Sequence, residues 1–111
     1  MSPLFQLDNT SLIIHVPTEL DHHNAEEIRK GADNMMEKRN IRSIVFDFFN
    51  TNFMDSSGIG VIMGRYKNLN FTGGKVLAVS VSPRIRRILT LSGIHKIIDI
   101  YDDFPQETKT L

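Results

Sequence analysis

The chain has 111 residues and no cysteine, and its 13 basic and 13 acidic residues leave no formal net charge. This length fits one compact domain. The missing cysteine excludes disulfides, thiolate metal sites and cysteine nucleophiles, and it fits a reducing cytosol. The balanced charge does not support direct binding to nucleic acid or to a membrane surface. No signal-peptide pattern opens the chain and no apolar run reaches membrane-span length, so we expect a cytoplasmic protein.

The first third of the chain predicts a hairpin followed by a helix. Residues 4–7 and 11–16 are expected strands, and the turn-forming sequence DNT between them favours an antiparallel pair. A first helix is expected to begin at an N-cap formed by Asp21 or Asn24. Its buried face would hold apolar residues at helical spacing: Ala25, Ile28, Ala32, Met35 and Met36.

The middle of the chain predicts a buried strand and a second helix. The strand spans residues 41–49, and its continuous apolar run favours burial on both faces, as in a parallel sheet. The helix spans residues 57–69. Glycines at 58, 60 and 64 predict close backbone approach to the sheet or to a partner. The buried stripe of this helix would comprise Ile59, Ile62, Met63, Tyr66 and Leu69.

The last third predicts a strand over 75–81, a third helix, a short strand over 97–100 and one or two helical turns after residue 101. Ser82 and Pro83 form a typical helix start, and Gly93 is a candidate C-cap. Alternating strands and helices imply right-handed crossovers, so the expected class is α/β with a mostly parallel sheet of four or five strands. The residues expected to face inward on the third helix are Ile85, Ile88, Leu89 and Leu91.

The segment 53–60, with sequence FMDSSGIG, lies where the middle strand hands over to the second helix. Unpaired N–H groups at a helix start can be capped by Asp or Ser, and the same positive end favours a phosphate. Ligand chemistry in such sheets gathers at the carboxyl ends of the strands, so residues 18–23 should meet this segment. The site therefore suits a phosphorylatable serine, and capping alone is the competing structural interpretation.

Catalytic and metal-binding interpretations of the same region are weaker. Serine catalysis lacks the G-x-S-x-G turn, and no phosphate-binding glycine motif is present. His22 and His23 are adjacent and would point in different directions from a helix start, which disfavours a metal site. Asp21 is expected to face Ser56, where it could position the serine hydroxyl or a Mg²⁺ brought by a kinase.

Three segments carry a family resemblance. Residues 53–67 (FMDSSGIGVIMGRYK) resemble the phosphorylation-site segment of the bacterial anti-anti-sigma factors, which have the STAS (sulphate transporter and anti-sigma antagonist) fold. Residues 19–23 (ELDHH) and 92–98 (SGIHKII) resemble two further signatures, in family order and spacing. The likeness covers nearly the whole chain and is greater to the sporulation members than to the general-stress paralogue. It implies a single STAS domain over residues 1–111, with an N-terminal hairpin and helices packed on a mixed, mostly parallel sheet.

The resemblance also implies a regulatory protein without enzymatic activity or cofactor. In that family the serine directly after the aspartate, here Ser56, is phosphorylated by a partner that is both an anti-sigma factor and an ATP-dependent serine kinase. The unphosphorylated form binds this partner and releases the sigma factor, and a serine phosphatase restores it. Asp21 matches an acidic residue near the serine. Thr18 departs from the pattern, which often has glycine there, and this leaves the conformation of that loop open.

The expected partner-binding residues surround the serine. Ile59 is expected to contact the partner, whereas core packing is favoured for Met63. One rival interpretation is a binding module of similar fold that senses a nucleotide or small anion at the serine rim. A second rival, from a different class, is a serine-dependent hydrolase or phosphotransferase. The full predicted contact set is Asp21, Asp55, Ser56, Ser57, Gly58, Ile59, Gly60 and Met63.

Overall fold

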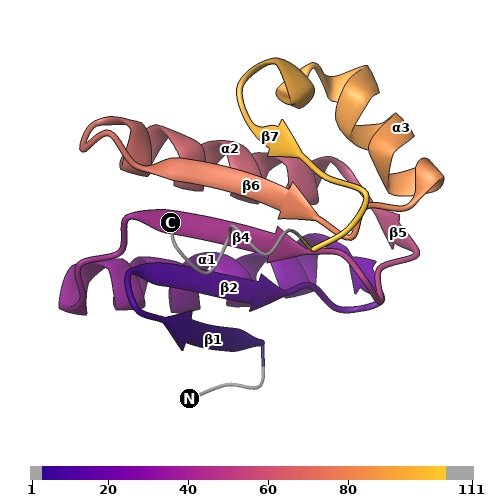
Figure 1. Ribbon diagram of the computed structural model, residues 1–111. Helices are drawn as coiled ribbons and strands as arrows, with labels where there is room; N and C mark the ends of the chain where they lie inside the picture. The colour runs from indigo at the N-terminus through magenta and orange to yellow at the C-terminus, as the bar shows by residue number, and fades with distance from the viewer. Residues whose placement is uncertain (1–3, 105–111) are drawn as a thin grey trace.

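A computed structural model describes residues 4–104, which form a five-stranded sheet in the order β1-β2-β4-β6-β7. The first two strands form an antiparallel hairpin, and the remaining neighbours are parallel. The predicted mixed, mostly parallel sheet with an N-terminal hairpin is therefore confirmed (Figure 1). The strands are β1 (Phe5–Asp8), β2 (Ser11–His15), β4 (Ser43–Asp47), β6 (Lys75–Val79) and β7 (Asp99–Ile100).

Two long helices lie side by side on one face of the sheet (Figure 1). These are α1 (His22–Lys38) and α2 (Ser56–Asn70). A shorter helix, α3 (Pro83–Ser92), and a 3₁₀ turn (Ile94–Lys96) lie at the end of the sheet beside β7. As predicted, Ser82 accepts a hydrogen bond at the start of α3, and Gly93 ends it in the left-handed conformation with φ 84°.

β4 is buried on both of its faces, which confirms the interpretation of its apolar run. Ile44 and Phe46 point into the main core beneath the helices, whereas Val45 belongs to a smaller cluster on the opposite face. Phe104 packs against this second cluster. In α1, the predicted apolar face is buried at Ala25, Ile28 and Ala32, and its two methionines are half-buried.

A second, two-stranded parallel sheet was not predicted. It consists of β3 (Glu19–Leu20) and β5 (Phe53–Met54), and Leu20 pairs with Met54. Strands of two residues are too short for an alternating apolar pattern to reveal them. Thr18 adjoins this small sheet, and its carbonyl oxygen accepts hydrogen bonds from the backbone N–H groups of Asn52 and Phe53 at 2.8 and 3.3 Å. Thr18 has no positive φ, so glycine is not required there.

Several local predictions were wrong. Leu91 is 78% exposed, because it lies about 200° around α3 from the buried Leu89. Within the chain, close approach holds only for Gly58, where a Cβ would lie 2.9 Å from the Leu20 side chain. At Gly60 and Gly64 a Cβ would meet nothing within 4 Å, so close approach of a partner stays a prediction at these two positions. No helix occurs in residues 101–104, and the rest of the predicted C-terminal turn lies outside the described residues.

Candidate functional site

The starts of α1 and α2 are built alike and lie next to each other. Each helix begins directly after an aspartate N-cap, and each aspartate follows a residue of the small β3–β5 sheet. Asp21 accepts a hydrogen bond from the Asn24 backbone N–H at 2.9 Å, and Asp55 accepts one from the Ser57 backbone N–H at 2.8 Å. The pairing of Leu20 with Met54 therefore sets the two caps in register.

Ser56 is the first residue of α2, and its side chain is exposed. Across residues 4–104, no side chain or backbone group forms a hydrogen bond with its hydroxyl. The backbone N–H groups of the first helical turn have no intrahelical acceptors, and they give this end of α2 a partial positive charge. An enzyme can therefore reach this hydroxyl, and a phosphate there would lie at the favourable end of the helix.

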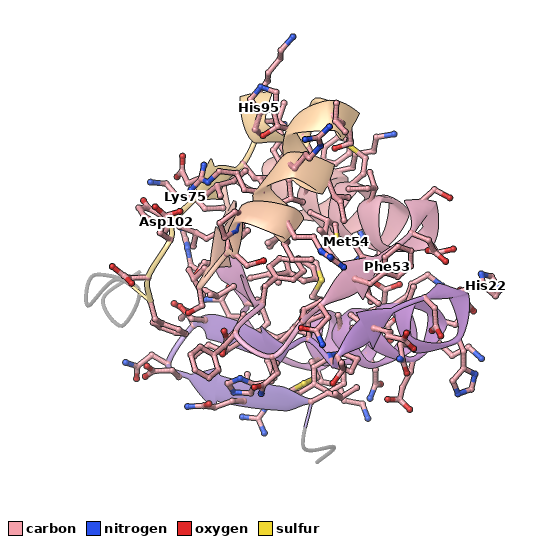
Figure 2. The ribbon with its side chains drawn as sticks, turned by 90° about the vertical axis from the view of Figure 1, so that its right-hand side faces the viewer. His22, Phe53, Met54, Lys75, His95 and Asp102 are labelled. Carbon is pink, nitrogen blue, oxygen red and sulfur yellow. The ribbon has the colours of Figure 1, made fainter. Side chains whose placement is uncertain are left out.

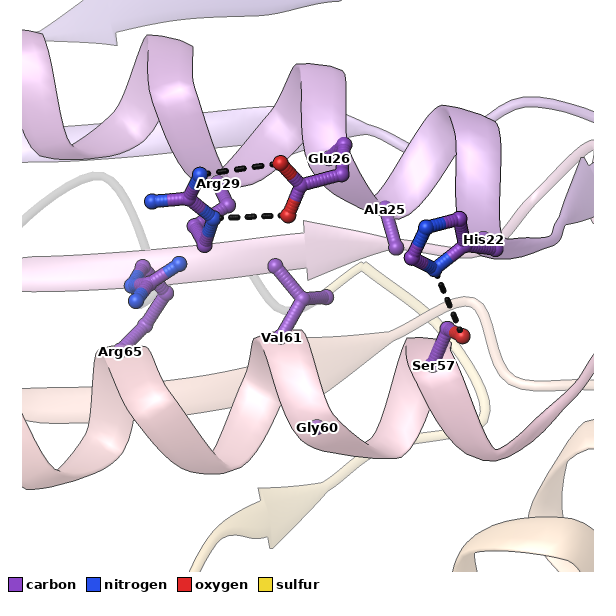
Figure 3. Close-up of a pocket in the computed structure, with 8 residues that line it drawn as sticks. All are labelled: His22, Ala25, Glu26, Arg29, Ser57, Gly60, Val61 and Arg65. Atoms are coloured by element: carbon purple, nitrogen blue, oxygen red, sulfur yellow. Dashed lines mark hydrogen bonds and ion pairs between the residues drawn. The ribbon is translucent and has the colours of Figure 1, made fainter.

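Ser57 and Asp21 have local partners of their own. The Ser57 hydroxyl lies 3.5 Å from Nδ1 of His22, which connects the starts of α2 and α1 (Figure 3). The hydrogen bond to Asp21 comes from its own helix, and none links it to Ser56 in the described structure. The pairing of Leu20 with Met54 places Asp21 near Asp55, the residue before Ser56, and the observed role of Asp21 is that of a cap. The contact with His22 was not predicted, because sequence alone does not fix a side-chain direction.

A groove of about 210 Å³ runs between α1 and α2, starting at the pair formed by Ser57 and His22 (Figure 3). At its other end, Arg65 is buried, and its Nε lies 3.2 Å from Oδ1 of Asp33. Burial lowers the pKa of Arg65, Asp33 raises it, and the nearby charge of Arg29 lowers it. The lining residues are His22, Ala25, Glu26, Arg29, Ser57, Gly60, Val61 and Arg65.

Arg29 and Glu26 form a two-pronged ion pair on the α1 side of the groove. Nε and Nη2 of Arg29 donate to the two carboxylate oxygens of Glu26 at 2.8 and 2.9 Å (Figure 3). The hydrogen bonds from Arg29 lower the pKa of Glu26 from 4.5 to about 2. The pair is exposed, so its contribution to stability is small. It holds both charges on the α1 wall of the groove.

The comparisons with known proteins match this architecture. The family model for the STAS domain matches residues 3–106. The chain belongs to the STAS domain family. A protein of Paenibacillus polymyxa named anti-sigma F factor antagonist is 44% identical over 92 residues, which cover 83% of this chain and 79% of that relative.

Two solved structures of SpoIIAA share this STAS fold. The anti-sigma factor antagonist SpoIIAA in its unphosphorylated form has a TM-score of 0.74 and 27% identity, covering 96% of this chain and 94% of that one. The phosphorylated form of SpoIIAA, called a Bacillus cell fate determinant, has a TM-score of 0.72 and 29% identity, covering 96% of both chains.

The other predicted contact residues differ in accessibility within the STAS domain. Gly58 is buried against Leu20, and Gly60 is exposed. Ile59 and Met63 are both half-buried and packed against the main core, so the expected distinction between them is not seen. Phe53, three residues before the serine, was not among the predicted contacts, yet it is 46% exposed on the same side of the molecule as His22 (Figure 2).

Neither a metal-binding cluster nor a membrane-spanning helix occurs in the described part of the chain. No group of three or more His, Asp or Glu side chains in residues 4–104 is placed to hold a metal ion. None of the helices there is both long enough and apolar enough to cross a membrane.

Proposed function

We propose that this STAS domain is an anti-sigma factor antagonist whose docking is controlled by phosphorylation of Ser56. In its unphosphorylated form it binds an anti-sigma factor that is also an ATP-dependent serine kinase, and the bound sigma factor is released. The observation that carries the proposal is the exposed Ser56 hydroxyl at the start of α2, in a chain 44% identical to an anti-sigma F factor antagonist. A cytoplasmic serine phosphatase would reverse the modification.

The surroundings of Ser56 explain why a phosphate would block docking without harming the fold. A phosphoserine adds about −1.5 to −2 charge at pH 7. At the exposed N-terminus of α2 this charge is stabilised by the helix dipole. Within an interface, the same charge would be desolvated beside the carboxylates of Asp21 and Asp55, which is costly because like charges repel.

The two forms of SpoIIAA support a switch without refolding. The unphosphorylated and phosphorylated structures match this chain with TM-scores of 0.74 and 0.72, so both resemble the same fold to nearly the same extent. We therefore place the effect of the phosphate at the docking surface. That surface comprises Asp21, Asp55, Ser56, Ser57, Ile59, Gly60 and Met63, and it leaves out the predicted contact Gly58, which is buried against Leu20.

We propose Ser56, and not its neighbour Ser57, as the phosphate acceptor. Ser57 is half-buried, and its hydroxyl faces His22 across the two helix starts. The hydroxyl of Ser56 points to no such partner among the described residues. A serine hydrolase would need a base on the nucleophile, and within residues 4–104 the histidine contact of this serine pair goes to Ser57. This favours a regulatory role over catalysis.

The test compares Ser56→Ala with Ser57→Ala, using the purified chain and its cognate anti-sigma factor. Ser56→Ala should capture the anti-sigma factor in the presence of ATP and take up no phosphate by mass spectrometry. Ser57→Ala should still be phosphorylated, because its acceptor is intact. Phosphate on Ser56→Ala, or failure of the unmodified chain to bind the anti-sigma factor, would overturn the proposal.

A further inference from the structure

A second pocket lies at the edge of the sheet opposite Ser56. It has a volume of about 200 Å³ and opens between the ends of α1 and α2, at the edge where β4 and β6 begin (Figure 1). Asn68 lines it, and Ser56 is the first residue of the same helix, so the two are about 18 Å apart along the helix axis. The lining residues are Met36, Arg39, Asn40, Ile41, Arg42, Asn68, Leu69 and Thr72.

Backbone contacts fix one wall of this pocket. The backbone N–H of Arg42 donates to the Thr10 carbonyl at 2.7 Å, and the Arg42 carbonyl accepts from the Lys75 N–H at 3.1 Å. A Cβ on Gly74 would lie 2.7 Å from that same carbonyl oxygen, so glycine is required for the chain after α2 to come this close. Arg42 is therefore held in place by the hairpin turn and by the start of β6.

The floor of the pocket is apolar, and its rim is cationic. Ile41 and Leu69 are buried, and Met36 is half-buried. Arg39 and Arg42 are exposed, and neither side chain forms an ion pair or a hydrogen bond within residues 4–104. None of the described lining residues is acidic. The pocket can therefore hold an apolar group and an anionic group at the same time.

The positive charge at this edge exceeds what the two helix ends require. Glu37 and Asp8 are the acidic residues near the pocket in sequence or across the hairpin, and they leave a surplus of three positive charges among the basic residues there. Two helix C-termini carry about −1 charge together, so about two positive charges remain without a counterpart. The basic residues are Lys38, Arg39, Arg42, Lys67 and Lys75.

We propose that this pocket binds an acidic segment of a protein partner, with one apolar side chain on the floor and flanking carboxylates on Arg39 and Arg42. A planar guanidinium matches a carboxylate in a two-pronged arrangement. A cavity of about 150 Å³ holds a benzene ring, so about 200 Å³ has room for one apolar side chain. Because the pocket lies at the edge opposite Ser56, the segment binds whether or not Ser56 is phosphorylated.

A protein segment suits the pocket better than nucleic acid does. Nucleic-acid sites are basic over an extended surface, whereas this chain has no net charge and the surplus is confined to one edge. Single-stranded nucleic acid also binds by stacking its bases on aromatic side chains, and none is present among the described lining residues. Single-stranded nucleic acid is therefore the competing ligand that the experiment must separate from an acidic peptide.

The first test titrates the purified chain with a capped peptide of four glutamates around one central leucine. The NMR signals of the Asn40 and Asn68 side-chain amides should both shift and saturate, because both residues line the pocket. Ser56→Asp should leave the Kd within about twofold, because the two sites are far apart. The same peptide with alanine in place of leucine should bind at least about fivefold more weakly, because less apolar surface is buried.

The second test compares two pairs of exposed arginines. Arg39→Gln combined with Arg42→Gln removes the rim charges. Arg84→Gln combined with Arg87→Gln removes the same charge from the start of α3, which follows the carboxyl end of β6. The first double variant should weaken peptide binding at least about fivefold, and the second less than about twofold. All four side chains are exposed, so the melting temperature should change little.

Four results would overturn the proposal. The first is the absence of saturable shifts with the leucine peptide. The second is equal weakening by the two double variants, which would mean general charge attraction. The third is loss of peptide binding in Ser56→Asp. The fourth is a short oligothymidine that shifts the same signals more strongly than the peptide at equal concentration. Each of these would leave the Ser56 switch standing, because capture of the anti-sigma factor is measured separately.

Discussion

The helices α1 and α2 begin in the same way, but their first turns differ in surface charge. Both follow an aspartate cap that the β3–β5 pairing sets in register. From there, residues 22–30 of α1 carry acidic and basic side chains at most outward positions, whereas residues 56–64 of α2 carry none. The fifth residue of α1 is Glu26, which is hydrogen-bonded to Arg29. The fifth residue of α2 is Gly60, which has no side chain to cover the helix backbone.

This difference supports the proposal that the first turns of α2 contact the partner. Charged side chains on α1 remain hydrated, and removing that water would oppose binding. On α2, glycines give up as much as about 1 kcal/mol each of helical stability relative to alanine. Packing within the chain requires glycine only at position 58, since an added methyl group at Gly60 or Gly64 would meet open space. The unneeded glycines make sense if another molecule approaches the α2 backbone.

The largest expected effect is on docking, when the same charge is added to each helix start. Ser56→Asp and His23→Asp both place a carboxylate in a first helical turn, where the dipole favours it. Ser56→Asp should weaken binding to the anti-sigma factor at least about 100-fold, because the charge enters the interface beside Asp55. His23→Asp should change the affinity less than about threefold. Calorimetry measures both, and equal losses would erase the proposed distinction between the helices.

The next effect is on stability and separates the glycines of α2. Gly58→Ala should lower the free energy of unfolding by about 1–3 kcal/mol, because its Cβ would lie 2.9 Å from Leu20. Gly60→Ala should raise it by as much as about 1 kcal/mol, since the methyl group is unobstructed and helix propensity improves. Urea unfolding measures both. A destabilised Gly60→Ala protein would show that this position is required by the fold.

The two caps should contribute similarly to stability. Asp21→Ala and Asp55→Ala each remove one side-chain acceptor from a helix start and should cost about 1 kcal/mol. Asn at either position keeps an acceptor, so Asp21→Asn and Asp55→Asn should recover most of the loss in thermal unfolding. A much larger loss at one cap than at the other would contradict their structural equivalence.

The smallest effect concerns the ion pair on α1. Because the pKa of Glu26 is lowered from 4.5 to about 2, its stabilising contribution is complete above pH 4.5 and is lost as the pH falls toward 2. NMR titration of the Glu26 carboxyl carbon should show a midpoint near pH 2, and Arg29→Gln should move it back toward 4.5. An ordinary midpoint in the unmodified chain would mean that the pair does not persist in solution.

Sequence patterns predicted what depends on periodic burial and on local capping. The apolar run of β4, the buried face of α1 and the Ser82 and Gly93 boundaries of α3 all follow from such local signals. Four of the five predicted strands were too long, and the first was shifted by one residue. In β4, for example, the flanking apolar residues Ile41 and Phe48 are buried but lie outside the strand. An apolar residue in the sequence indicates burial, and it does not show whether the buried residue is also paired in a strand.

The site was predicted only where backbone topology determines it. The carboxyl-edge rule brought residues 18–23 to the serine, as the neighbouring caps of Asp21 and Asp55 show. The contact between Ser57 and His22, and the groove that ends at Arg65, depend on side-chain directions and on the packing of α1 against α2. A buried arginine has no local signal, and Asp33 and Arg65 are 32 residues apart.

The β3–β5 ladder links residues 34 positions apart through only two paired residues on each side. So short a ladder cannot offset the entropy of closing that long a loop by itself, and it forms only when the surrounding core is in place. A nascent, truncated or thermally unfolded copy therefore does not bring the two aspartate-capped termini together. An enzyme that recognises the two paired helix starts would therefore modify only folded chains. Unfolded chains would not compete for that enzyme.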